Sequence, residues 1–196
     1  MSEVLKFEDL NLEGTYTYAD YLLWKFQERL ELIKGKIFKM SPAPSRKHQK
    51  ISFNITGIFY NYFQNKSCEV YSAPFDVRLT TKDKNDNEIS TVVQPDLCVV
   101  CDPEKLDDRG CVGAPDFIIE ILSPGNSSKE MRIKYDLYEE CGVREYWIVR
   151  PEYEEISQYV LEEGKYVLKA TFTGIEEEIT PYIFPDLKII WADIFA

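Results

Sequence analysis

The order of apolar and polar positions along the chain predicts alternating strands and helices. Residues 92–100 and 115–122 are two short apolar runs, rich in β-branched side chains and separated by a polar loop. Both are expected to be buried strands. Further strands are expected over residues 70–79 and 145–149. A capping signal, helical spacing and a closing glycine over residues 127–142 predict a helix between the last two strands.

The N-terminal part of the chain predicts a helix, a hairpin and a longer helix. The stretch Thr17-Tyr18-Ala19-Asp20 is a capping signal for a first helix, which we expect to end near Gln27. Residues 30–40 are interrupted by Lys34-Gly35 and predict a two-residue β-hairpin. A helix opening at Ser45 carries apolar residues at the spacing of one buried stripe: Ile51, Ile55, Ile58, Phe59, Tyr62 and Phe63.

These elements indicate an α/β fold. Without the first helix, the hairpin and the C-terminal strands, the order is helix, strand, strand, strand, helix, strand. We therefore expect an αβββαβ core with a mixed sheet flanked by helices, an N-terminal helix and hairpin, and a C-terminal β extension. The 196 residues are 44% hydrophobic and show no repeat or linker, which predicts one domain over 1–196.

Composition limits the cellular setting. No apolar run approaches the roughly 20 residues that span a bilayer, and the N-terminus is acidic where a signal peptide would be basic. We expect a cytoplasmic protein without membrane association. The five cysteines are odd in number and scattered, so we expect free thiols. Cys98 and Cys101 have C-x-x-C spacing, but no second pair follows, and core packing is favoured over a metal or redox site.

The charge is unevenly distributed along the chain. The net charge is −11, yet residues 25–50 contain eight Lys or Arg against two Glu. From residue 151 onward, the chain contains ten Asp or Glu and three Lys. This asymmetry permits an anion-binding face on an acidic protein, although an ordinary solvated hairpin and helix start would have the same composition.

The candidate chemistry lies in the two apolar runs. Each contains one acid, Asp96 and Glu120, and an unpaired buried carboxylate is costly. If the two strands are neighbours with these faces on the same side, the carboxylates converge. Two adjacent carboxylates require a proton or a cation between them, and an oxygen-rich set suits Mg²⁺ or Mn²⁺.

Four stretches together resemble a known family. They are Gln94-Pro95-Asp96, residues 119–124, residues 141–149 and the hairpin at residues 31–36. In combination they are similar to the Uma family of restriction endonucleases, within the PD-(D/E)XK nuclease superfamily. The resemblance extends from about residue 16 to residue 195.

The resemblance implies an endonuclease that hydrolyses nucleic-acid phosphodiester bonds with a Mg²⁺ or Mn²⁺ cofactor. Asp96 and Glu120 would hold the metal. The lysine of the superfamily should stand two residues after the second acid, where this chain has Leu122. In the Uma pattern a lysine on the following helix takes its place, and Lys134 would assist the attacking water. The alternative for Lys134 is an exposed helix residue.

Two further acids are candidates for the site. The resemblance implies that Glu31 supplies a third carboxylate, and the alternative is that it pairs with Lys36 or Arg46. Asp76 lies next to the expected Asp96 strand, which predicts a metal ligand or else a salt-bridge partner of Arg78.

The start of the second helix borders such sites in the family, which predicts substrate binding by His48 and Gln49. The basic charge of the same helix start predicts phosphate contacts by Arg46 and Lys47. A single histidine on an apolar stripe is also compatible with a core residue. The expected partners are nucleic acid, with DNA favoured, and a second copy of the chain in a homodimer. Two alternatives are a catalytically silent nucleic-acid-binding or interaction module and a metal-binding protein without nuclease activity.

Overall fold

The computed structural model describes residues 3–40, 44–80, 85–123, 128–175 and 177–196. The predicted order of the core is confirmed. It runs through α2 (Arg46–Phe63), β3 (Glu69–Ser72), β6 (Leu97–Val100), β9 (Phe117–Ile121), α3 (Ser128–Cys141) and β10 (Glu145–Arg150). The Ser45 hydroxyl caps α2 by accepting from the His48 N–H, and Gly142 follows α3 with a positive φ of 87°.

In the described part of the chain the strands form two six-stranded mixed sheets and a two-stranded one. The central sheet has the order β12-β11-β10-β9-β6-β3, where β11 is Glu155–Glu162 and β12 is Lys165–Phe172. The side sheet has the order β2-β1-β5-β4-β8-β7. Its strands are β1 (Leu30–Ile33), β2 (Lys36–Lys39), β4 (Val77–Arg78), β5 (Val92–Val93), β7 (Leu106–Asp107) and β8 (Gly110–Val112). The remaining elements are η1 (Phe7–Asp9), α1 (Tyr18–Tyr21), η2 (Pro103–Lys105), β13 (Glu178–Ile179), β14 (Ile189–Ile190) and α4 (Trp191–Phe195).

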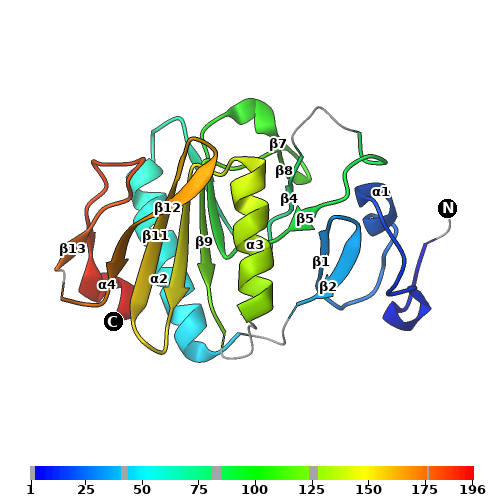
Figure 1. Cartoon of the computed structure of the whole chain (residues 1–196), viewed down its shortest axis with the longest axis horizontal. Coiled ribbons are helices and arrows are strands. Elements are labelled where there is room, and N and C mark those ends of the chain that lie inside the picture. Colours follow the sequence, from blue (N-terminus) through cyan, green and yellow to red (C-terminus); the bar gives the residue numbers. More distant parts are fainter. Residues whose placement is uncertain (1–2, 41–43, 81–84, 124–127, 176) are drawn as a thin grey trace.

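The central sheet is covered by a helix on each face, α2 on one and α3 on the other (Figure 1). The alternation along β9 explains the two layers. Phe117 and Ile119 pack with Ile55 of α2, whereas Ile118 lies in the apolar cluster that contains Leu137 of α3. Each strand of the sheet centre therefore contributes to both cores.

The strand register brings the two candidate acids together. β6 and β9 are antiparallel neighbours, with Leu97 opposite Ile119 and Cys98 opposite Ile118. Continuing this register by one residue sets Asp96, which directly precedes β6, across from Glu120. β9 and β10 are parallel, as the connection through α3 requires.

Two strand predictions were wrong in extent. The expected strand over residues 70–79 is two strands, β3 in the central sheet and β4 in the side sheet, with Pro74 between them. The expected strand over residues 92–100 is likewise divided into β5 and β6, with Pro95 between them. Proline has no N–H to donate to a sheet, and at each of these positions the chain passes from one sheet to the other.

Two predictions for the N-terminal helix and the cysteines also require correction. The first helix ends at Tyr21 rather than near Gln27, because the chain beyond it pairs with the N-terminal segment, where Trp24 bridges Val4. Cys68 and Cys101 form a disulfide, contrary to the expected free thiols. The β3–β6 register explains the pairing, since Glu69 opposite Val100 brings the next residues face to face.

Cys98, Cys111 and Cys141 are free. The N-cap expected at Ser127 lies outside the described residues. The two-residue hairpin is confirmed, with β1 and β2 joined through Lys34 and Gly35, both at positive φ. Among the described helices, none has the length and apolar character needed to cross a membrane.

Candidate active site

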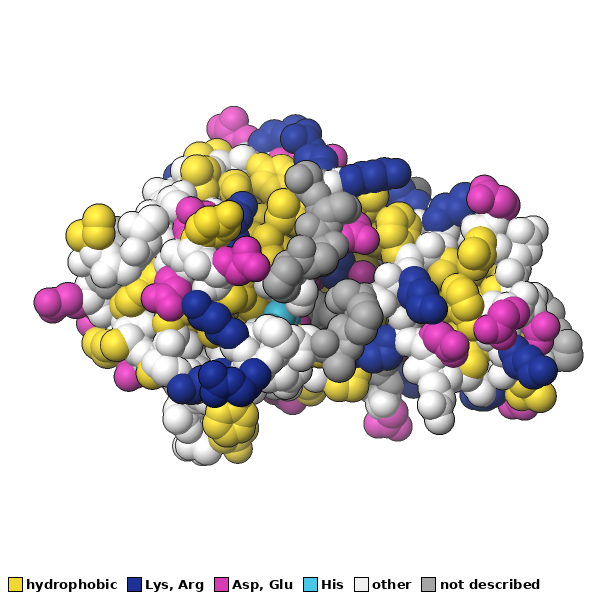
Figure 2. All heavy atoms as spheres, turned by 90° about the horizontal axis from the view of Figure 1, so that it is seen from below, with side chains coloured by type: hydrophobic (Ala, Val, Ile, Leu, Met, Phe, Trp, Pro, Cys, Tyr) yellow, Lys and Arg dark blue, Asp and Glu magenta, His cyan; other side chains and the backbone are white. Residues whose placement is uncertain are grey.

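A cavity of about 500 Å³ opens between the β1–β2 hairpin, α2, α3 and the adjoining ends of β6 and β9. Its lining includes Glu31, His48, Asp96, Glu120 and Lys134. Figure 2 shows this face of the molecule, with the imidazole of the single histidine visible beside a hollow. The structure thus places both strand acids, the hairpin acid and the helix lysine in one cavity.

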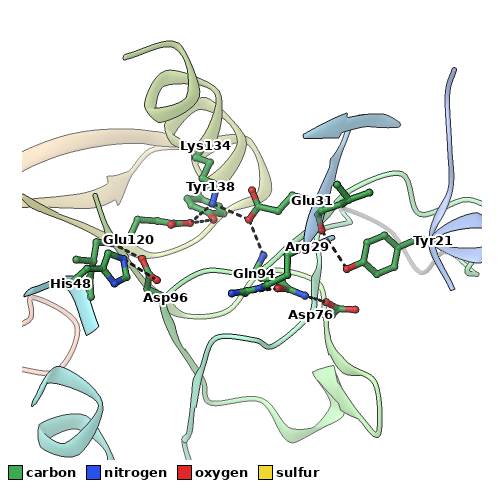
Figure 3. A network of polar contacts seen from close by, with 12 residues as sticks. Tyr21, Arg29, Glu31, His48, Asp76, Gln94, Asp96, Glu120, Lys134 and Tyr138 are labelled. Carbon is green, nitrogen blue, oxygen red and sulfur yellow. Dashed lines mark hydrogen bonds and ion pairs between the residues drawn. The ribbon is translucent and has the colours of Figure 1, made fainter. Parts of the chain in front are cut away.

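Lys134 stands at the centre of the polar network (Figure 3). Its Nζ donates to Glu31 Oε1 and to Glu120 Oε1, at 2.9 Å each. Burial opposes the ammonium form, but the two carboxylates outweigh that penalty and raise the pKa of Lys134. The lysine is therefore a charged donor held from both sides, not the exposed helix residue that the sequence also allowed.

Glu120 is a buried acid that interacts with one cation, two other carboxylates and a tyrosine hydroxyl. The hydroxyl of Tyr138, one helical turn after Lys134, donates to Glu120 Oε1 at 2.6 Å. Burial raises the pKa of Glu120 to about 7; Lys134 opposes the rise, and the carboxylates of Asp96 and Glu31 add to it. At neutral pH this carboxyl can both hold and release a proton.

Asp96 joins the strand ends to α2. Its Oδ2 accepts the backbone N–H of Ile121 at 2.7 Å, which fixes the carboxylate at the end of β9. Its Oδ1 lies 3.4 Å from His48 Nε2. Burial lowers the pKa of His48, but the hydrogen bond and charge of Asp96 outweigh it, and the net direction is upward. His48 is thus a partner of an acid as well as a buried residue.

Gln94 connects the hairpin to the rest of the site. Its backbone N–H donates to Glu31 Oε1 at 3.0 Å, and its side-chain amide donates to Asp76 Oδ1 at 2.8 Å. Arg29 in turn donates to Gln94 Oε1 at 2.7 Å. Gln94 therefore links Asp76 to the site, and Asp76 is not among the described residues that line the cavity.

The structure shows which ion pairs Glu31 and Arg78 form. Glu31 pairs with Lys134 and not with Lys36 or Arg46. Arg78, the possible partner of Asp76, forms its ion pair with Asp107.

The predicted substrate-binding residues at the start of α2 are not all at the cavity. Gln49 lines it beside His48. Arg46 is exposed and does not line it, and Lys47 pairs with Glu154 of the β10–β11 turn at 3.1 Å.

Sequence reasoning missed three residues of the network: Tyr138, Gln94 and Arg29. The spacing of Lys134 and Tyr138 by one helical turn was a usable signal, because residues four apart share a helix face. The signal for Gln94 was its position two residues before Asp96. Nothing in the sequence distinguished Arg29 from the other cations of the basic segment.

The carboxylates of the site can bind a divalent cation only if water molecules supply the rest of its ligands. Within the described residues no group of three or more His, Cys, Asp or Glu is arranged to hold a metal ion. Mg²⁺ commonly takes one or two carboxylates and keeps several waters. Among the described residues, the buried acids Glu31 and Glu120 share a single cationic partner, Lys134, while Asp96 lies beside them. This excess of carboxylate charge suits a cation bound by Asp96 and Glu120.

Fold and site together define the class of proteins with a nuclease-like αβββαβ core and paired acids at adjoining strand ends. The chain belongs to the Uma2 family, described as "Putative restriction endonuclease", whose model matches residues 18–192. Family membership agrees with the resemblance carried by the sequence motifs.

Two individual proteins are similar to this chain. A crystal structure of "a putative nuclease belonging to DUF820" from Anabaena variabilis ATCC 29413 superposes with a TM-score of 0.70 over 92% of this chain and 97% of that one, at 19% identity. The "Uncharacterized protein slr1290" of Synechocystis sp. is 25% identical over 121 residues. That match covers 61% of this chain and 60% of the relative. The first likeness supports the fold, and the second names no activity.

Proposed function

We propose that this protein is a metal-dependent endonuclease that hydrolyses phosphodiester bonds of nucleic acid, with DNA as the favoured substrate. The observation that carries the proposal is the position of Lys134 Nζ, 2.9 Å from both Glu31 and Glu120, in the cavity that Asp96 also lines. Two acids at adjoining strand ends and one ammonium form the donor set that phosphodiester hydrolysis needs. The family description supports the reaction class.

Asp96 and Glu120 would hold Mg²⁺ or Mn²⁺. When bound, such a cation lowers the pKa of a water and stabilises negative charge on a phosphate. The Ile121 N–H fixes one oxygen of Asp96, and Tyr138 fixes one oxygen of Glu120, so each carboxylate is oriented before substrate arrives.

Lys134 would act as a charged donor. Because Glu31 and Glu120 raise its pKa, it keeps its proton at neutral pH and cannot serve as the base. It would orient the attacking water or neutralise a phosphate oxygen. Glu31 holds the ammonium in place from the hairpin side, as a positioning residue.

The test is a supercoiled-plasmid nicking assay in Mg²⁺, Mn²⁺ or EDTA. Wild type is compared with Asp96→Asn, Glu120→Gln and Lys134→Ala, and with Lys129→Ala, which removes an exposed lysine of the same helix. We expect cleavage only with a divalent cation, losses of about 100-fold or more in the three site variants, and full activity in the Lys129 variant. Circular dichroism checks that every variant is folded.

Three outcomes bear on the proposal. Activity that survives in Asp96→Asn or Glu120→Gln would remove the acids from the mechanism. Equal loss in the Lys129 and Lys134 variants would show a general effect of the helix. A folded wild type that is inert on plasmid and on single-stranded DNA and RNA would favour the silent binding module instead.

The homodimer and the cytoplasmic location stay predictions.

A further inference from the structure

Phe53 is an exposed aromatic residue at the cavity. Its side chain is 80% exposed, although it stands in the middle of α2 and lines the cavity that holds the site acids. It belongs to none of the three apolar clusters and makes no ring contact within the described residues. The exposed ring therefore stands at a polar cavity, where a bound ligand could contact it.

The neighbours of Phe53 on the helix are polar and also face the cavity. Gln49, Ser52 and Thr56 line it together with Phe53, at the spacing of one helix face. This face is separate from the buried stripe of Ile51, Ile55 and Phe59. One wall of the cavity therefore combines an aromatic plane with amide and hydroxyl groups, which is how proteins bind an unstacked base.

The opposite wall suits a phosphate backbone. Arg29 and Lys39 line the cavity from the hairpin side, and both are exposed. Between the walls, the acids lie deep, with Glu31 only 5% and Glu120 only 8% exposed. A cavity of about 500 Å³ is in the range that encloses a whole small ligand and is larger than a phosphate group alone needs.

We propose that Phe53 stacks on the base of an unpaired nucleotide while its phosphate enters the cavity, so that the substrate is a single-stranded or locally unpaired segment. The inference rests on the proposed nuclease function. In a paired duplex both faces of each base are covered by its neighbours, and the ring of Phe53 could not reach them without unstacking. Base–aromatic stacking tolerates any base, so no sequence preference is implied by this contact.

The test pairs a residue change with a base change. Fluorescence anisotropy measures binding of a short labelled single strand, either complete or with one central abasic position, with Ca²⁺ in place of Mg²⁺ and intact strands verified on a gel. The proteins are wild type, Phe53→Ala, Phe53→Trp and the control Tyr60→Ala, which removes another exposed aromatic of α2, one that does not line the cavity.

We expect Phe53→Ala to weaken binding of the complete strand by about 5- to 150-fold and to change binding of the abasic strand much less. Phe53→Trp and Tyr60→Ala should bind like wild type. Equal losses on the complete and abasic strands would overturn stacking, as would a Tyr60→Ala loss equal to that of Phe53→Ala. Tighter wild-type binding to a paired duplex than to the single strand would overturn the substrate class.

The same measurements distinguish a failure of the stacking inference from a failure of the proposed nuclease function. A wild type that nicks plasmid while Phe53→Ala behaves normally sinks only the stacking inference. A wild type that neither binds nor cleaves any of these nucleic acids removes the nuclease proposal, and the inference with it.

Discussion

Lys134 is stabilised by carboxylates from two different parts of the fold. Glu31 reaches it from the hairpin and Glu120 from β9, each at 2.9 Å. Because Glu120 still contacts Lys134 when Glu31 is removed, we expect the loss of Glu31 to change the position of Lys134 more than the stability of the protein. This separates a positioning role from a structural one.

Glu31→Gln should lower the rate of cleavage by about 10- to 100-fold, the usual effect of removing a residue that orients a reacting group. The glutamine oxygen can still accept the Gln94 N–H, so the melting temperature should change little. Steady-state nicking rates and thermal melts check both parts. Glu28→Gln, an exposed acid shortly before β1, is the control. A rate unchanged in Glu31→Gln would exclude the positioning role.

Glu120 makes stability depend on pH in a defined direction. Its folded pKa of about 7 lies above the ordinary value of 4.5, so the folded state binds more protons than the unfolded state between these values. Stability without metal is therefore lost as pH rises through this window. The stability that a bound metal adds should instead increase as pH rises, because the cation binds the deprotonated carboxylate.

Glu120→Gln removes this titration. From about pH 5 to about pH 8, the free energy of unfolding of metal-free wild type should fall relative to the variant by up to about 3 kcal/mol. Urea melts in EDTA at both pH values give the measurement. Glu152→Gln, an exposed acid in the β10–β11 turn, should follow wild type. Parallel pH profiles for wild type and Glu120→Gln would contradict the assignment.

Glu145 shows that burial alone does not identify a site acid. It is completely buried, yet it accepts hydrogen bonds from Trp147, Gln158, Tyr182 and Ile183. Every donor belongs to the scaffold and none belongs to the cavity lining. Asp96 and Glu120 differ because their carboxylates face a cavity.

At the scale of elements, the β1–β2 hairpin decides where Glu31 stands. Its turn requires Gly35, whose φ is 79° and whose added Cβ would lie 2.5 Å from Thr15 Cγ2. The Gly35 N–H also donates to Ser90 O at 2.6 Å, which ties the turn to the segment before β5. A change at this turn should therefore shift β1 and with it the position of Glu31 in the site.

Gly35→Ala should destabilise the protein by about 1–3 kcal/mol, because a residue with a Cβ is strained at this φ and meets a neighbour. Gly57→Ala is the matched control: it lies inside α2 with nothing within 4 Å of the added Cβ, and should stabilise by about 0.5–1 kcal/mol. Chemical denaturation measures both. Equal effects of one sign would show that the turn geometry is not the cause.

The hydrophobic pattern predicted which helices and strands exist better than it predicted where each one ends. The stripe of α2 and the turn at Lys34-Gly35 were predicted correctly, because each depends on residues close in sequence. The divided strands were missed, because β-branched residues continue on both sides of Pro74 and Pro95 and the pattern contains no information about which sheet they join.

At the scale of the whole molecule, few cations face the proposed substrate. The chain carries a net charge of −11, and the described lysines and arginines that line the cavity are Arg29, Lys39 and Lys134. A broad basic surface would release many counterions on binding nucleic acid, whereas a small cationic cavity releases few. The salt dependence of binding therefore measures the size of the interface.

We expect log K against log salt to have a slope of about −2 on a single strand, from the three lining cations at about −0.7 for each contact. Lys39→Ala should make the slope shallower by about 0.7, the value for one phosphate contact. Lys165→Ala, an exposed lysine on β12 paired with Glu139, is the control and should leave the slope unchanged. Anisotropy titrations at several salt concentrations give these slopes. A slope near −10 would place binding outside the cavity.

The order of the core, the hairpin and the positions of Asp96 and Glu120 in two apolar runs were predictable from the sequence alone. These features follow from periodicity and turn chemistry, which act between near neighbours. The motifs also indicated the family and singled out Lys134.

The three-dimensional structure was needed to show that Lys134 contacts both Glu31 and Glu120, that Gln94 links Asp76 and Arg29, and that Cys68 pairs with Cys101. Each of these contacts joins residues far apart in sequence. Their distances depend on strand register and on how the helices cover the sheet, and neither quantity is encoded in a local pattern.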